Sequence, residues 1–115
     1  MSVTGIGGLF FRANDPKALS AWYKTHFDIG GFDWQQAAGP TVFAPFSQST
    51  DYFPAEKQWM LNLRVSALDP ILEKLTAAGI AITTNPDWNT PETGRFARIH
   101  DPEGNAIELW EPPPE

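Results

Sequence analysis

The side chains best suited to chemistry gather near the C-terminal end of the chain, between Gly94 and Pro112. The sequence DPEG at residues 101–104 has the order typical of a type I turn followed by a glycine bulge. It predicts a hairpin in which residue 106 lies opposite 100, 108 opposite 98, and 110 opposite 96. Because side chains alternate along a strand, one face then carries Phe96, Arg98, His100, Ala106, Glu108 and Trp110. A carboxylate, a guanidinium, an imidazole and an indole on one face indicate a lined cavity rather than a packed core.

Glu108 and His100 are the candidates on this face for proton transfer or for metal binding. Neither is assigned a catalytic role, and a solvated histidine beside the turn is the alternative for His100. Arg12, Arg64 and Arg98 have guanidinium groups that could clamp a carboxylate or phosphate. The alternative is that one or two of them pair with Glu108, which Arg98 faces directly across the hairpin.

Composition narrows the class of protein. The chain has 115 residues, which fits one domain, and a formal net charge of −6, which argues against a nucleic-acid surface. It has no cysteine, which excludes disulfides and thiolate ligands. No apolar run approaches the roughly 20 residues needed to span a bilayer. We therefore expect a cytoplasmic protein whose partner is a small molecule, with no nucleic acid and no membrane.

The first half of the chain predicts a strand, a helix and two more strands. Residues 3–13 form the expected first strand, and Asp15-Pro16 is a helix cap followed by proline. Apolar residues at helical spacing continue the helix to Phe27, and Gly30-Gly31 ends it. Short strands are expected at residues 32–37 and 41–46.

The second half repeats this order. Residues 59–65 alternate as a strand should, Asp69-Pro70 predicts a second helix cap, and Gly79 ends that helix. A short strand at 80–83 and the C-terminal hairpin follow. Since neither half could bury a sheet face alone, the two halves must pack together.

Three segments resemble the glyoxalase/bleomycin-resistance/dioxygenase superfamily, which has the vicinal oxygen chelate fold. They are FFRANDPKALSAWYKTHF, LRVSALDPILEKLTAAGI and IHDPEGNAIELWEP. The resemblance implies an α+β domain over residues 1–115, with module one at about 1–55 and module two at about 56–112. Each module would be βαβββ, and together they would form a cupped mixed sheet with the helices outside. It also implies a homodimer.

Metal-dependent members of this superfamily carry four ligands on the inward face of the cup. The resemblance places these ligands at Gly8, Phe43, Met60 and Glu108, so three of the four positions have no ligating side chain. A divalent metal needs three or more nitrogen or oxygen ligands. We therefore expect no metal and no other cofactor.

The leading hypothesis is a protein that binds a small organic molecule, anionic or aromatic, in a metal-free cup. The expected ligand-binding residues are Phe10, Arg12, Phe43, Met60, Asn62, Arg64, Arg98, His100, Glu108 and Trp110. One alternative is an enzyme, a metal-dependent lyase, isomerase or dioxygenase of the same superfamily that uses Glu108. Another is an accessory domain whose loops bind a protein. The loop aromatics Tyr52, Phe53 and Trp88 suit a lid or a subunit interface equally well.

Overall fold

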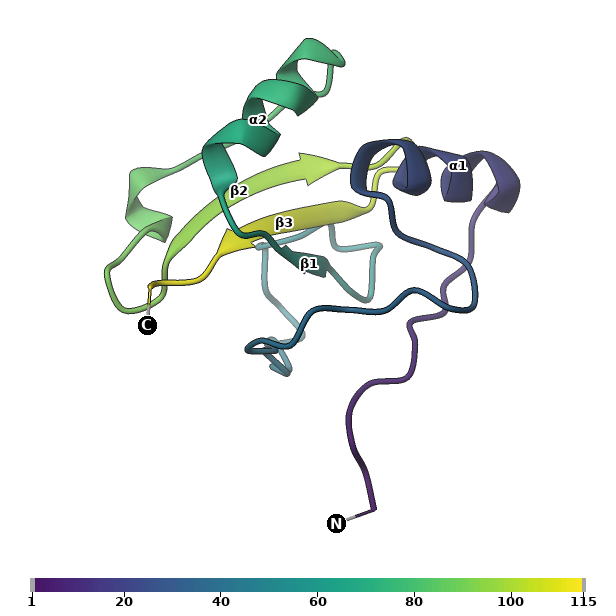
Figure 1. Cartoon of the computed structure of the whole chain (residues 1–115), viewed down its shortest axis with the longest axis horizontal. Coiled ribbons are helices and arrows are strands. Elements are labelled where there is room, and N and C mark those ends of the chain that lie inside the picture. The colour runs from purple at the N-terminus through teal and green to yellow at the C-terminus, as the bar shows by residue number, and fades with distance from the viewer. Residues whose placement is uncertain (1, 115) are drawn as a thin grey trace.

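A three-stranded sheet and two helices make the frame of the molecule in this computed structural model, which describes residues 2–114. The elements in chain order are α1 (Pro16–Phe27), β1 (Leu61–Arg64), α2 (Leu68–Ala77), the 3₁₀ turn η1 (Pro86–Trp88), β2 (Arg95–His100) and β3 (Ala106–Glu111). Both helices lie over one face of the sheet, with α1 at the β2–β3 turn and α2 near the middle (Figure 1). The predicted α+β class and mixed sheet are confirmed, and the sheet of this one chain is open.

The hairpin has the register that its turn residues predict. Strand β2 pairs antiparallel with β3, placing Arg98 opposite Glu108 and Phe96 opposite Trp110. Gly104 has a φ of 81°, and its N–H donates to the Asp101 carbonyl at 3.0 Å. Strand β1 pairs with the other edge of β3 and runs parallel to it. The order of strands in the sheet is therefore β1-β3-β2. The strand expected at residues 80–83 is reduced to one bridge between Thr83 and Arg98.

The core lies between the helices and the apolar face of the sheet. Its buried members come from both helices and both hairpin strands: Leu19, Tyr23, Leu68, Leu75, Ala97, Ile99, Ile107 and Leu109. The opposite sheet face carries Asn62, Arg98, Glu108 and Trp110. Packing the helices on one face thus leaves the chemically mixed face for the site.

The two helix starts are capped differently. Asp15 caps α1 as predicted, because its side chain accepts from the Ala18 N–H at 3.1 Å. The predicted cap at Asp69 is wrong: α2 already begins at Leu68, which is buried, and Asp69 lies in its first turn. The N–H of Leu68 instead donates to the Glu111 carboxylate at 2.8 Å. Burial of Leu68 against the sheet therefore moves the helix start ahead of the Asp-Pro pair.

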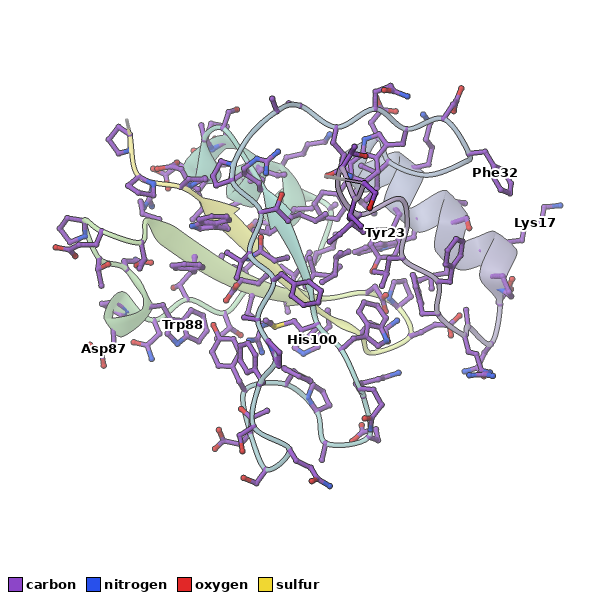
Figure 2. All side chains as sticks on the ribbon, turned by 90° about the horizontal axis from the view of Figure 1, so that it is seen from below. Lys17, Tyr23, Phe32, Asp87, Trp88 and His100 are labelled. Carbon is purple, nitrogen blue, oxygen red and sulfur yellow. The ribbon has the colours of Figure 1, made fainter. Side chains whose placement is uncertain are left out.

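Module one does not form its predicted strands. Residues 3–13, 32–37 and 41–46 run as extended chain without strand pairing, and Phe10 and Phe43 are 91% and 84% exposed. The N-terminal segment runs away from the sheet, and Phe32 projects outward (Figures 1 and 2). A strand needs a neighbour to satisfy its backbone and cover its apolar side chains. No segment between residues 2 and 114 of the one chain supplies that neighbour.

Candidate functional site

Glu108 is the centre of a polar cluster on the face of the sheet opposite the helices. Its side chain is 8% exposed and lies in the middle of β3. One carboxylate oxygen accepts from the Tyr52 hydroxyl at 2.5 Å, and the other accepts from the Asn62 side-chain amide at 2.7 Å. Asn62 reaches it because β1 pairs with β3 at this level. Both oxygens of a buried carboxylate are therefore hydrogen-bonded.

Arg98 lies beside Glu108 on the next strand, under two aromatic rings. Its guanidinium carbon is 4.7 Å from the Tyr52 ring centre and 5.9 Å from that of Trp88, distances at which a cation is attracted to a ring face. The Nε and Nη2 atoms are buried and have no hydrogen-bond partner within residues 2–114. Across the described chain Arg98 makes no ion pair with Glu108, so the alternative that these two side chains pair is wrong.

Tyr52 remains a phenol at neutral pH. Burial raises its pKa, and the hydrogen bond to Glu108 and the charge of that carboxylate raise it further, to about 12, against the opposing effect of Arg98. A neutral phenol donates a hydrogen bond, whereas a phenolate beside Glu108 would be repelled. The Tyr52–Glu108 contact is therefore intact over the physiological pH range.

An aromatic wall continues the site along the hairpin. Trp110 is 9% exposed, and its indole N–H donates to the Thr93 carbonyl at 2.7 Å. The rings of Trp110 and Phe96 are stacked, with centroids 6.2 Å apart and planes 6° apart. The indole is held in place by this hydrogen bond and by the cross-strand stack.

The other predicted ligand-binding residues are spread over the molecule. Met60 is half-buried just before β1. Arg64 donates to the backbone carbonyls of Ala37, at 2.7 Å, and Pro40, so it holds a loop of module one rather than Glu108. Phe10 and Arg12 lie exposed on the extended N-terminal segment, as Phe43 does on a later one.

His100 belongs to a different part of the surface. It is exposed at the end of β2, where it lines a shallow hollow of about 260 Å³ with Trp22, Ile80 and the hairpin turn. The other histidine, His26, lies on α1 with its ring centroid 4.9 Å from that of Trp22 and the ring planes tilted by 60°. The side-chain hydrogen bonds of Glu108 within residues 2–114 go to Tyr52 and Asn62, and none joins Glu108 to His100.

Comparison with solved structures places this arrangement in a known fold. The chain aligns with the crystal structure of TnmS3, an antibiotic binding protein from Streptomyces sp. CB03234, over 97% of this chain and 98% of that one, with 25% identity and a TM-score of 0.62. A glyoxalase/bleomycin resistance protein from the same organism is 39% identical over 44% of this chain and 42% of that chain, with a TM-score of 0.38. The chain resembles the glyoxalase/bleomycin-resistance superfamily. No family model and no curated protein sequence matches the chain.

The residues that the resemblance places at the metal-ligand positions of this superfamily do not fit a divalent ion. Gly8, Phe43 and Met60 offer no nitrogen or oxygen side-chain ligand, and both oxygens of Glu108 already accept hydrogen bonds. Within residues 2–114, no three His, Asp or Glu side chains are arranged so that they could hold a metal ion. Across the same residues, no helix is long and apolar enough to cross a membrane.

Two residues that the structure brings to the Glu108 cluster were not among the residues that the sequence placed there. Tyr52 and Trp88 belong to segments without strand or α-helical periodicity, and the sequence left them as lid or interface aromatics. Trp88 lies on η1 beside the outward-pointing Asp87 (Figure 2). The two rings meet edge to face at 6.2 Å, above Arg98. The sequence did show aromatic residues in polar loops. It could not show that these rings cover Arg98.

Proposed function

We propose that this protein binds a small aromatic molecule, one that carries an anionic or hydrogen-bond-accepting group, in a metal-free cup on the Glu108 face of the sheet. The observation that carries the proposal is Arg98, whose buried Nε and Nη2 donors have no partner within residues 2–114. Buried donors without partners are costly, and an oxygen of a ligand would satisfy them. Trp88 and the Trp110–Phe96 stack supply aromatic surface around this group.

The likeness to an antibiotic binding protein supports the same reading, because sequestering a molecule requires shape, stacking and hydrogen bonds but no bond cleavage. A natural-product antibiotic with an aromatic ring system is thus one class of ligand for this chain. The ligand itself would be identified by screening, with the site tested first by simple probes.

We also propose that the working form is a homodimer. The large exposed apolar side chains lie in the unpaired segments of module one, among them Ile6, Phe10, Phe32 and Phe43. The outer edge of β1 has no strand partner within residues 2–114. Extended apolar segments and a free sheet edge are complementary, and a second copy of the chain provides both. Such pairing would build the remaining wall of the cup.

The test of the site uses two fluorescent probes that differ in charge. Anilinonaphthalenesulfonate is an aromatic anion, and N-phenylnaphthylamine is its uncharged counterpart. We expect Arg98→Gln to weaken binding of the anion by roughly tenfold, the effect of one hydrogen bond to a charged group, and to leave the neutral probe almost unchanged. Arg95→Gln is the matched control, because Arg95 lies on the same strand but its side chain is exposed and pairs with Asp69. Equal loss in both variants would contradict this placement of the site.

The superfamily alternative, a metal-dependent enzyme, has its own measurement. The purified protein would be incubated with Mn, Fe(II), Ni and Zn, desalted and assayed for bound metal. We expect no stoichiometric metal. Stoichiometric metal that is lost on Glu108→Gln would favour a lyase, isomerase or dioxygenase and would overturn the metal-free proposal.

A further inference from the structure

Tyr52 occupies the candidate site as a bound phenol would. It comes from the polar loop 47–57 and not from the sheet, yet its hydroxyl reaches Glu108 and its ring lies on the Arg98 guanidinium. These two contacts, one hydrogen bond to a carboxylate and one cation–π contact, are those that a free hydroxyaryl molecule would make at the same place.

No backbone–backbone hydrogen bond joins the loop that carries Tyr52 to another segment of residues 2–114. Its backbone hydrogen bonds within the described chain are local, from Thr50 to Ser47 and from Lys57 to Pro54. The loop contacts the rest of the chain through side chains, among them Tyr52 itself and Lys57, which donates to the Glu103 carbonyl at 3.3 Å. Since the Tyr52 side chain is also part-exposed, a ligand can replace it without breaking strand pairing.

The Tyr52 contacts leave Arg98 unsatisfied. The ring covers the guanidinium, but a phenol has no second oxygen to accept from the buried Nε and Nη2 atoms. A hydroxyaryl ligand with an additional anionic oxygen would keep the Glu108 hydrogen bond and also satisfy these donors. Such a ligand would therefore compete favourably with Tyr52 for the site.

We propose that the site selects hydroxyaryl ligands: a phenolic hydroxyl of the ligand displaces that of Tyr52 as the donor to Glu108, and the aromatic ring lies against Arg98 and Trp88. This rests on the proposed function, which it narrows from aromatic molecules in general to those that carry a hydrogen-bond-donating hydroxyl. Glu108 then acts as a specificity-determining acceptor, and Tyr52 acts as an internal competitor that keeps the carboxylate hydrogen-bonded when no ligand is present.

The test compares two naphthoates. The first carries its carboxylate on one ring and a hydroxyl group on the other ring, and the second is the methyl ether of the first. Both are anions of nearly equal shape, but only the first donates a hydrogen bond. Calorimetric titration of the full chain should show the hydroxy acid binding about tenfold tighter. Glu108→Gln should reduce this preference to less than about threefold, because a neutral amide is a weaker acceptor. Glu111→Gln is the control on the same strand, and it should keep the preference.

The outcomes separate this inference from the function on which it rests. If neither acid binds, the aromatic-anion site itself is contradicted. If both bind equally well, or if the preference survives unchanged in Glu108→Gln, the site exists and the hydroxyaryl inference is wrong.

A second experiment uses NMR to detect displacement of the Tyr52 side chain by the ligand. The chain has two tyrosines, so tyrosine labelled with ¹³C at the ring Cζ alone gives two resonances, which Tyr23→Phe and Tyr52→Phe assign. The hydroxy acid should shift the Tyr52 signal and leave that of Tyr23 in place. Tyr52→Phe should tighten hydroxy-acid binding severalfold, because it removes the competing hydroxyl while keeping the ring. An unshifted Tyr52 signal at saturation would overturn the displacement.

Discussion

Tyr52 and Glu108, which are 56 residues apart in the chain, are joined by a 2.5 Å hydrogen bond across the candidate site. The contact ties a loop of the first half of the chain to the central strand of the second half. It also sits beside Arg98, which the same tyrosine ring covers. The chemistry of the site therefore depends on a residue that no strand or α-helix positions.

Alkaline pH should weaken the fold through Tyr52. Its pKa is raised to about 12 in the folded protein, first by burial and then by Glu108, against an unfolded value of about 10. Its contribution to stability is complete below pH 10 and is lost as the pH rises through 12. Tyrosinate absorbance should stay low at pH 10, and Tyr52→Phe should remove the step near pH 12. A full tyrosinate signal at pH 10 from the folded protein would contradict the contact.

Tyr23→Phe should destabilise the protein without affecting the site. The Tyr23 hydroxyl donates to buried Asp101 at 2.7 Å, linking α1 to the hairpin turn. Burial, and then the hydrogen bond to Asp101, raise the Tyr23 pKa above its ordinary value. Removing the donor should cost about 1–3 kcal/mol in the free energy of unfolding. Urea denaturation measures this loss, and unchanged probe binding by the folded variant is the control.

Gly94→Ala should be more damaging than the same change at Gly79. A methyl group at Gly94, where φ is 102°, would lie 2.2 Å from the Glu111 carbonyl oxygen, whereas at Gly79, where φ is 81°, it would meet no atom within 4 Å. Gly79→Ala should therefore cost only the left-handed strain, about 1–2 kcal/mol. Gly94→Ala adds a backbone clash, so we expect about 3 kcal/mol or more. Similar thermal midpoints for the two variants would contradict this prediction, because the backbone near Gly94 would then have shifted to accommodate the methyl group.

Charges on the exposed segments of module one should separate the proposed dimer. Phe10→Asp and Phe43→Asp place a carboxylate on residues that are 91% and 84% exposed in the single chain. If a second copy covers them, sedimentation should shift from dimer to monomer, because burying an unpaired charge is costly. Lys17→Asp, at the exposed start of α1, is the control and should stay dimeric. A monomeric wild-type protein at high concentration would overturn the dimer.

The hairpin and the first helix could be predicted from the sequence because local chemistry specifies them. The DPEG turn fixes the β2–β3 register, and side-chain alternation then fixes which residues share the face of Glu108. Asp15 caps α1 by bonding to a backbone N–H three residues later. Each of these depends on residues within a few positions of one another, so one sequence is enough to determine them.

The partners of the polar side chains were decided only by the tertiary structure. Glu111 rather than Asp69 caps α2, and Arg64 binds loop carbonyls of module one rather than Glu108. Tyr52 reaches Glu108 from a loop whose sequence has no periodicity to show where its side chain points. Such contacts join segments that are brought together by core packing, and chain position does not specify them. The sequence by itself determined the hairpin register and which polar and aromatic residues share the face of Glu108. The tertiary structure decided that Tyr52 contacts this face and that Arg98 keeps unsatisfied donors there, because only packing brings a distant loop onto a sheet.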